Sequence, residues 1–385
     1  MDDFRIDERA VSENLRLAAL QANADLDTVT QRAQEGVGLT PNDMAVLWTA
    51  PALHTETLYE LAREARRIRP ARLETFSPLY MTNTCDGECR LCGMRRDNPA
   101  LVRQTATLEE VKEQLRILSQ RGVRAVALVT GEYRAATRDW AMQYINQALL
   151  AALEMGFHHV LTNVGSLADE ELHKLLSGVP RAPDGTVAVR LTMSTFQETY
   201  SRATYAKFTG SDPGNPRADF DRRLTNFDRA FRTGIRNANP GILVGLSRDL
   251  GYEMVALALH ARHLLARGMD VYLSVPRLRQ IAGQKTECGA TNEDFVRLVA
   301  VLSLALPACK LVITTRENAA MQHKLAPIVN VISPGSSAVA PYTRTSTRFL
   351  LETSQFEVLD QRPLEDILRE HLVHSGTIEN FNPAH

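Results

Sequence analysis

The feature that most constrains the fold is a regular alternation of short apolar runs and amphipathic stretches that begins near residue 74. Each apolar run is five to seven residues long, as expected for a buried strand. The stretches between them repeat apolar residues every three or four positions, which is typical of helices. Because parallel strands need a connection of helix length, the alternation predicts βαβ units. The predicted strands are Phe76–Met81, Arg124–Thr130, His158–Asn163, Val187–Met193, Gly241–Leu246, Val271–Val275, Lys310–Thr315 and Val329–Ser333.

Eight strand–helix units are the number that closes a (β/α)8 barrel of the TIM type, and an open sheet is the alternative. Residues 1–73 precede the first strand and show helical spacing, so we expect a helical N-terminal extension that includes a helix start at Thr40. We place the barrel at residues 74–342. Residues 343–385 follow the last strand, and we expect this C-terminal segment to pack over one face of the barrel.

Composition restricts the class of protein. The 385 residues carry 44 Lys and Arg against 45 Asp and Glu, and this balance argues against a protein bound to nucleic acid or to an anionic membrane. No apolar run approaches the ~18–20 residues of a membrane-spanning helix. The first residues, MDDFRIDERA, resemble neither a secretory signal nor a transit peptide. We therefore expect a cytoplasmic protein with no nucleic acid or membrane partner.

The cysteines are the strongest functional signal. Three of the five, Cys85, Cys89 and Cys92, fall within eight residues directly after the first predicted strand. Three thiolates on one loop can bind three irons of a 4Fe–4S cluster, which leaves the fourth iron open to a ligand that the protein does not supply. Cys288 and Cys309 lack this spacing, and we expect them to be ordinary free thiols.

Other interpretations of the three cysteines are weaker. A structural zinc site normally needs four Cys or His ligands, and the nearest histidines, His54 and His158, are far away in sequence. Buried structural cysteines would not sit among Asp, Glu, Arg and Gly, and a redox sensor needs only two thiols. The cluster interpretation is therefore preferred.

The ends of the predicted strands carry unusual side chains. In a (β/α)8 barrel the active site forms where the strands end. Gly and Ser are ordinary in such loops, but Glu132, Glu198, Arg277 and Arg316 each follow an apolar strand directly. We therefore expect an active site at the carboxyl ends of the strands, beside the cysteines.

The segment from Pro78 to about Pro341 resembles the ThiH/HydG/NosL group of radical S-adenosylmethionine (SAM) aromatic amino acid lyases. The resemblance is carried by FQETY, DFDRRLTNFDRA, SVPRLR and TTRE, and PLYMTNTC, TGEY, ADFDRR, NPGILVGL, SVPR and VISPGSSAVAPY look most like the branch of the group that cleaves tryptophan. The C-terminal cysteine motif that holds a second cluster in HydG is absent, which argues against formation of carbon monoxide and cyanide.

The resemblance implies roles for individual residues. It implies that Cys85, Cys89 and Cys92 bind the 4Fe–4S cluster and that SAM occupies its open iron. For the substrate, it implies that Arg316 pairs with the carboxylate and that Tyr80 and Ser333 line the pocket. The positions matched to SAM contacts are Leu91, Gly131, Glu132, Ser166, Gln197, Glu198 and Gly245.

The resemblance also implies a reaction. A 5′-deoxyadenosyl radical would abstract a hydrogen from the amino group of L-tryptophan, the side chain would fragment, and a carboxyl-bearing fragment would migrate to the indole, giving 3-methyl-2-indolic acid for thiopeptide antibiotic biosynthesis. A reductant such as flavodoxin or ferredoxin is implied. The alternatives are a tyrosine lyase that gives p-cresol and dehydroglycine, a tryptophan lyase with another product such as 3-methylindole, and a non-catalytic metal-binding barrel.

Overall fold

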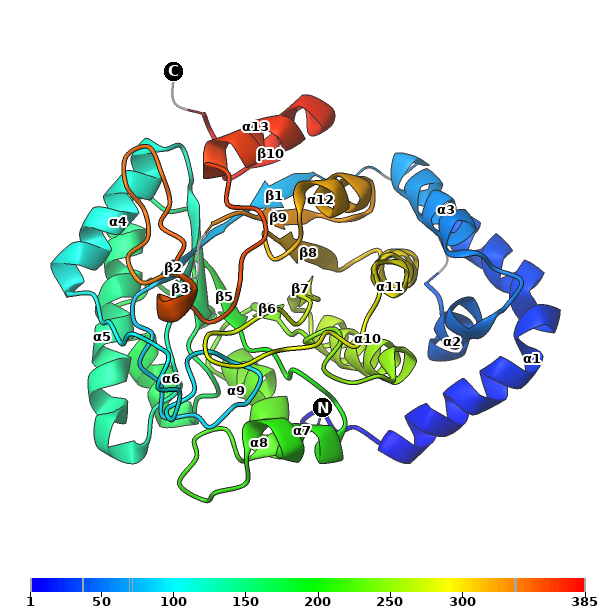
Figure 1. Ribbon diagram of the computed structural model, residues 1–385, viewed down its shortest axis with the longest axis horizontal. Helices are drawn as coiled ribbons and strands as arrows, with labels where there is room; N and C mark the ends of the chain where they lie inside the picture. Colours follow the sequence, from blue (N-terminus) through cyan, green and yellow to red (C-terminus); the bar gives the residue numbers. More distant parts are fainter. Residues whose placement is uncertain (1, 37, 69, 71, 336–337, 384–385) are drawn as a thin grey trace.

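The computed structural model describes residues 2–36, 38–68, 70, 72–335 and 338–383, and Ser336 and Ser337 of the VISPGSSAVAPY motif therefore lie outside it. Its centre is a ten-stranded sheet in which all paired strands are parallel, in the order β10-β1-β9-β8-β7-β6-β5-β4-β3-β2 (Figure 1). The strands are β1 (Leu73–Thr75), β2 (Ser77–Tyr80), β3 (Ala125–Val129), β4 (His159–Asn163), β5 (Arg190–Ser194), β6 (Asn237–Asn239), β7 (Asp270–Ser274), β8 (Lys310–Thr314), β9 (Val331–Ser333) and β10 (Ile378–Glu379).

The sheet curls back on itself through its first strand. Only Phe76 separates β1 from β2. Strand β1 pairs with β9 and strand β2 pairs with β3. One nearly continuous stretch of chain therefore joins the two ends of the row of strands from β3 to β9. This arrangement confirms the predicted TIM-type barrel. The seam beside β1 is filled by β10, which pairs with β1 while Phe381 just beyond it bridges to Val123.

The helices surround the sheet, and several begin at a side-chain cap, including the helix start predicted at Thr40. Thr40, Thr107 and Thr291 each accept a hydrogen bond from the backbone N–H three residues on and begin a capping box. The helices are α1 (Glu8–Glu35), α2 (Pro41–Thr49), α3 (Thr55–Ile68), α4 (Leu108–Gln120), α5 (Ala135–Glu154), α6 (Asp169–Leu175), α7 (Arg202–Thr209), α8 (Phe220–Leu224), α9 (Asn226–Arg232), α10 (Leu250–Ala266), α11 (Asn292–Ala305), α12 (Ala319–Leu325) and α13 (Leu364–Ser375), with 3-10 turns η1 (Ala326–Ile328) and η2 (Leu351–Thr353).

The first three helices pack outside the barrel. Helix α1 is a single helix of 28 residues, because neither Gly nor Pro interrupts it. Helices α1 and α2 contact α10, and α2 and α3 contact α11 (Figure 1). This second layer explains why α10 and α11 are apolar on most of their surface: the barrel covers one side and the N-terminal helices cover the other.

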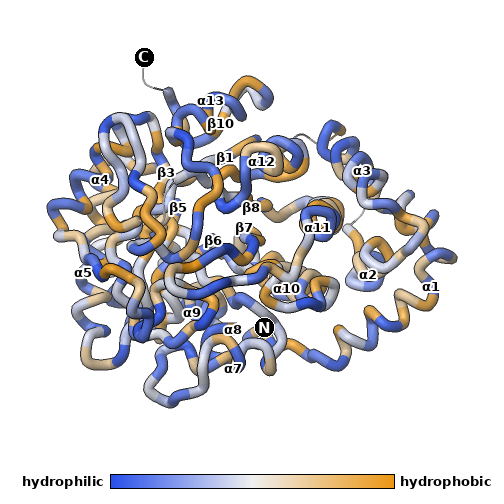
Figure 2. Tube along the Cα trace, viewed as in Figure 1, coloured by the Kyte–Doolittle hydropathy of each residue, from blue (hydrophilic) through white to orange (hydrophobic). Residues whose placement is uncertain are grey.

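One predicted strand was misplaced. The fifth barrel strand is β6, Asn237–Asn239, and not the apolar run Gly241–Leu246. The strand is polar, as its colour in Figure 2 shows, so hydropathy could not identify it. The apolar run follows directly and makes single parallel bridges to both neighbours, such as Ile242 to Glu198.

A buried carboxylate, Glu74, and three partly exposed charged side chains form a network at the amino-terminal end of the barrel. The carboxylate of Glu74 on β1 accepts hydrogen bonds from Arg190 at 2.7 Å and from the Tyr272 hydroxyl at 2.9 Å, and it also pairs with Lys310. Arg190 in turn pairs with Glu379 of β10 at 2.6 Å. This network ties the C-terminal strand to four barrel strands, β1, β5, β7 and β8.

The opposite end is crossed by a segment that we call the cover segment, residues 350–360. Its backbone bonds to the loop that carries Cys85, Cys89 and Cys92, which we call the cysteine loop: the Gly93 N–H donates to the Gln355 carbonyl oxygen at 2.8 Å. It also bonds to the end of β8, where the Leu359 N–H donates to the Thr315 carbonyl oxygen at 3.0 Å. The cover segment therefore spans the mouth of the barrel. Within the described residues, no helix combines the length and the apolar content needed to cross a membrane.

Candidate active site

A cavity opens where the barrel strands end. The last residue of every strand from β2 to β9 lines it, as expected for the carboxyl face of a (β/α)8 barrel. The cysteine loop and the cover segment close its sides. These eight strand-end residues are Tyr80, Val129, Asn163, Ser194, Asn239, Ser274, Thr314 and Ser333.

The three clustered cysteines line this cavity together. Two backbone N–H groups, those of Gly87 and Glu132, donate to Cys85 Sγ, each at 3.3 Å, and a third, that of Met94, donates to Cys92 Sγ at 3.4 Å. Burial raises the pKa of the Cys89 thiol to about 12 and that of Cys85 to about 11. Burial alone therefore disfavours the thiolate form of these cysteines. A bound metal cation would favour that form, so the loop is suited to bind one.

Two glycines leave room around the sulfur atoms. A Cβ on Gly87 would lie 3.2 Å from Cys85 Sγ, and one on Gly131 would lie 2.2 Å from the Thr84 carbonyl oxygen, so Gly131 has no room for a side chain. Across the described part of the chain, no three His, Cys, Asp or Glu side chains converge on the position of a single metal ion. A 4Fe–4S cluster fits this spacing, because each cysteine binds a different iron.

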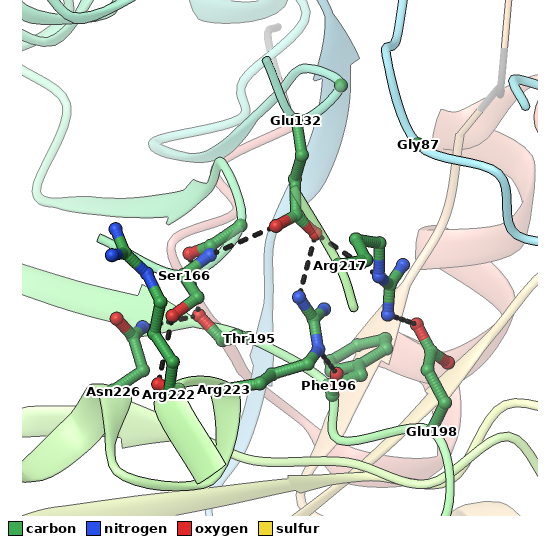
Figure 3. A network of polar contacts seen from close by, with 12 residues as sticks. Gly87, Glu132, Ser166, Thr195, Phe196, Glu198, Arg217, Arg222, Arg223 and Asn226 are labelled. Carbon is green, nitrogen blue, oxygen red and sulfur yellow. Dashed lines mark hydrogen bonds and ion pairs between the residues drawn. The ribbon is translucent and has the colours of Figure 1, made fainter. Parts of the chain in front are cut away.

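Arginines from the segment after α7 organise the acidic residues of the cavity (Figure 3). Arg223 Nη1 donates to Glu132 Oε1 at 2.7 Å, and Arg217 pairs with the same oxygen at 3.3 Å and with Glu198 Oε1 at 3.0 Å. Burial by itself would raise the pKa of Glu132, but the two guanidinium groups outweigh it and lower that pKa. Glu132 is therefore a carboxylate at neutral pH, held in one orientation at the edge of the cavity.

Glu198 has a strained backbone. Its φ of 70° lies in the left-handed region, which a residue with a side chain seldom occupies. Two backbone hydrogen bonds fix this conformation: the Glu198 N–H donates to the Gly241 carbonyl oxygen, and the Leu243 N–H donates to the Glu198 carbonyl oxygen. Strain of about 1–3 kcal/mol is characteristic of functional positions that the surrounding structure fixes.

The wall opposite the acids contains Arg316. Its guanidinium carbon lies 3.1 Å from the centroid of the Phe356 ring, and its Nη1 donates to the carbonyl oxygen of Arg277 at 3.4 Å. Among the described residues, no carboxylate pairs with it. Burial lowers the pKa of Arg316 to about 10, so it is still a cation at neutral pH. The adjacent Tyr80 hydroxyl donates to Gln355 Oε1 at 2.7 Å.

Most of the residues predicted for the site meet in this cavity. The three cysteines, Leu91, Gly131, Glu132 and Glu198 line it together with Tyr80, Arg316 and Ser333. The roles implied for them stay predictions, but their convergence from strands far apart in the sequence places them within reach of one ligand set.

Ser166 and Gln197 are not among the residues that line the cavity, and the SAM contacts implied for them stay predictions. The Ser166 hydroxyl donates to the carbonyl oxygen of Arg222 at 3.0 Å, on the outer side of the network. Gln197 is buried between Phe196 and Glu198, which do line the cavity.

Gly245 is also outside the cavity. It has a φ of 90°, and a Cβ there would lie 2.4 Å from Cys288 Sγ. The glycine thus allows the loop between β7 and α11 to approach the backbone, and the SAM contact implied for Gly245 stays a prediction.

The structure adds site residues that sequence reasoning missed. Arg217, Arg223, Gln355 and Phe356 all line the cavity. Arg223 belongs to the DFDRRL stretch, whose charges look like a solvated helix face in the sequence. Gln355 and Phe356 belong to the cover segment, which has no periodic pattern and no motif, so only tertiary structure reveals them.

Comparison with known proteins agrees with this geometry. Residues 274–373 match the Biotin and Thiamin Synthesis associated domain family. Over 322 residues the chain is 28% identical to 2-iminoacetate synthase from Escherichia coli (strain K12), covering 82% of this chain and 80% of that one. The crystal structure of HydG, a maturase of the FeFe-hydrogenase, is 30% identical and superposes with a TM-score of 0.78 over 96% of this chain and 79% of that one.

The chain belongs to the ThiH/HydG group of radical SAM enzymes. As a member of this group it is a radical SAM lyase of the aromatic amino acid type, with a 4Fe–4S cluster and SAM as cofactors. The family, enzyme class and cofactors predicted from the sequence are confirmed. Methylornithine synthase, at 19% identity and a TM-score of 0.70 over 93% of this chain and 97% of that one, shares the fold of this radical SAM protein.

Proposed function

We propose that this protein cleaves the side chain of an aromatic L-amino acid whose carboxylate is bound by Arg316. The observation that carries the proposal is that one cavity contains both the three clustered cysteines and a buried guanidinium with no carboxylate partner among the described residues. Burying a cation without a partner is costly, so an anionic ligand is expected at that position. A planar guanidinium also orients a carboxylate through two hydrogen bonds.

Cys85, Cys89 and Cys92 would hold three irons of the cluster, and SAM would occupy the fourth. When bound, these groups supply a 5′-deoxyadenosyl radical that takes a hydrogen atom from the substrate amine. Glu132 is suited to the amino group of SAM because its carboxylate is ionised and fixed by two arginines. We assign Leu91 to the adenine. An external one-electron donor, such as flavodoxin or ferredoxin, would complete the system.

The protein's contribution to the reaction is to position the amino acid and to exclude water. Arg316 binds the carboxylate, so the amine and the side chain of the substrate take fixed directions. Tyr80 and Ser333 line the same pocket, and Phe356 of the cover segment provides an apolar wall. A closed apolar surround prevents a reactive radical from meeting water or stray hydrogen donors.

Two substrates are supported by different observations. Tyrosine is favoured by the similarity to 2-iminoacetate synthase, since 2-iminoacetate is the dehydroglycine that tyrosine cleavage releases beside p-cresol. Tryptophan, with 3-methyl-2-indolic acid as product, is favoured by the motifs PLYMTNTC, TGEY and SVPR. The similarity extends over most of both chains, so we rank tyrosine first.

The test is a product assay with anaerobically reconstituted protein, SAM, dithionite and each amino acid in turn. Formation of p-cresol from tyrosine would support the first substrate, whereas 3-methyl-2-indolic acid or 3-methylindole from tryptophan would support the second. If 5′-deoxyadenosine forms but neither amino acid is consumed, the aromatic amino acid proposal is wrong. Protein that binds no iron and cleaves no SAM would support a non-catalytic barrel instead.

A further inference from the structure

Gln355 connects two parts of the site that belong to different elements. Its side-chain oxygen accepts the hydrogen bond of the Tyr80 hydroxyl at 2.7 Å, and its side chain lines the same cavity as Cys92, near the Cys92 sulfur. Because the oxygen faces Tyr80, the amide NH2 is the group that faces Cys92. The orientation of this amide is thus determined by its two partners.

The backbone of the cover segment holds Gln355 against the cysteine loop. The Gly93 N–H, next to Cys92, donates to the Gln355 carbonyl oxygen at 2.8 Å. A Cβ on Gly93 would lie 2.7 Å from the Ser354 carbonyl oxygen, so the two backbones are in direct contact. Asn83 adds a side-chain hydrogen bond to the Thr353 carbonyl oxygen at 2.9 Å. The side chain of Gln355 is therefore presented to Cys92 by a fixed backbone.

We propose that Gln355 is a positioning residue that donates a hydrogen bond to the Cys92 thiolate in the cluster-loaded protein and orients Tyr80 through the same amide. This inference rests on the proposed function, because it requires Cys92 to be a cluster ligand. It assigns to the cover segment a part in setting the properties of the cluster, in addition to closing the cavity.

The physical consequence is a change in reduction potential. A hydrogen bond to a ligand sulfur withdraws negative charge from it, which favours the reduced and more negatively charged state of the cluster. Removing the donor should therefore make the reduction potential more negative. A residue with only a packing role would change stability or cluster content but would leave the potential of the remaining cluster where it was.

The experiment is a redox titration of reconstituted full-length protein, monitored by the electron paramagnetic resonance signal of the reduced cluster. We expect Gln355→Leu to shift the midpoint potential to a more negative value than in the wild type. Gln355→Glu should shift the midpoint potential in the same direction and further, because a carboxylate places a negative charge beside the thiolate and donates no hydrogen bond. Gln361→Leu is the matched control, since Gln361 lies just beyond the cover segment, is exposed, and bonds only to the Val358 carbonyl oxygen at 3.1 Å.

Tyr80→Phe supplies a second test that retains both the cysteines and Gln355. It removes the hydrogen bond to the Gln355 amide oxygen, so that amide can rotate. We therefore expect the midpoint potential to become more negative, but by less than in Gln355→Leu. If both Gln355→Leu and Tyr80→Phe load iron normally and titrate at the wild-type potential, the inference is wrong. If instead the wild type itself carries no cluster, it is the proposed function that fails. Should Gln355→Leu not take up iron, the Tyr80→Phe potential decides alone.

Discussion

The two ends of the barrel both bury charged side chains, but they balance them differently. At the amino-terminal end, the acids Glu74 and Glu379 meet the cations Arg190 and Lys310, so the charges cancel. At the carboxyl end, the cavity-lining acids Glu132 and Glu198 pair with Arg217 and Arg223 while Arg316 has no carboxylate partner within the described residues, which leaves one cation in excess.

This difference separates a network that stabilises the fold from one prepared for ligands. A closed set of ion pairs satisfies its own members and needs nothing else. A site with an excess cation is more stable when an anion binds, and the anions expected here are the substrate carboxylate and the thiolate-bound cluster. We therefore expect substitutions at the carboxyl end to impair chemistry and those at the amino-terminal end to impair stability.

The largest effect should come from the cysteines. Replacing Cys85, Cys89 or Cys92 with Ala removes one iron ligand, so formation of 5′-deoxyadenosine should be abolished, as measured chromatographically beside the iron content. Cys288→Ala is the control, because Cys288 lies outside the cavity and should leave both readouts unchanged. Substantial activity in any of the three variants would contradict the assignment.

Next in size is Arg316→Met. Loss of a buried charge partner for the substrate carboxylate should lower kcat/KM for the amino acid by about 100- to 1,000-fold, which corresponds to roughly 3–4 kcal/mol. Iron content should stay at the wild-type level. Arg248→Met, at an exposed position on the same face, should be nearly silent. Unchanged turnover in Arg316→Met would remove this residue from the substrate site.

At the amino-terminal end, Glu74→Gln should cost about 3 kcal/mol of unfolding free energy, because it leaves Arg190 and Lys310 with one acid fewer. Glu64→Gln, whose partner Arg67 is exposed, should leave the free energy of unfolding nearly unchanged. Thermal or chemical denaturation measures both. The KM values of folded Glu74→Gln for SAM and the amino acid should match the wild type, and a change in them would break the separation of the two ends.

The smallest effect concerns pH. Burial would raise the pKa of Glu74, but Lys310 and Arg190 outweigh burial and lower that pKa. The ionised Glu74 therefore contributes to stability above the pKa of an unfolded Glu, and this contribution is lost as the pH falls through the lowered pKa. Glu253, at the start of α10, pairs with no cation in the part of the chain that the structure describes. Its carboxylate accepts hydrogen bonds from the Thr199 hydroxyl and from the Tyr200 N–H, the latter at 2.7 Å.

Burial raises the pKa of Glu253 to about 7, so the folded state favours its protonated form and stability is lost as the pH rises from the unfolded pKa towards 7. Relative to Glu253→Gln, the wild type should lose about 2 kcal/mol between pH 5.5 and 8. Denaturation of both proteins at several pH values measures this, and parallel stability curves would show that Glu253 is not the group responsible.

Much of the fold could be predicted because the alternation of apolar runs and amphipathic helices is local and repeats eight times. The exception was β6, where Asn239 faces polar partners inside the barrel: its side chain bonds to Ser194 at 3.1 Å and to Ser274 at 2.9 Å. A polar strand gives no hydropathy signal. The predicted division into an N-terminal extension, a barrel and a C-terminal segment at residues 73 and 343 stays a prediction.

The site divides in the same way. The cysteines could be predicted from their spacing, and Arg316 and Glu132 from their place directly after strands. Arg217 and Gln355 could not, because each reaches the cavity through an irregular segment whose path depends on long-range contacts. Ser166, Gln197 and Gly245 were assigned by their order along the chain, which does not specify whether a residue faces the cavity.

The cover segment has a consequence for how the protein is assembled. A chain is synthesised from its N-terminus, and domains begin to fold in that order. Residue 92 of the cysteine loop precedes residue 354 of the cover segment by 262 positions (354 − 92). The thiols therefore leave the ribosome long before the residues that enclose them. Until the cover segment has been translated, the mouth of the barrel cannot close, and iron can reach the cysteine loop.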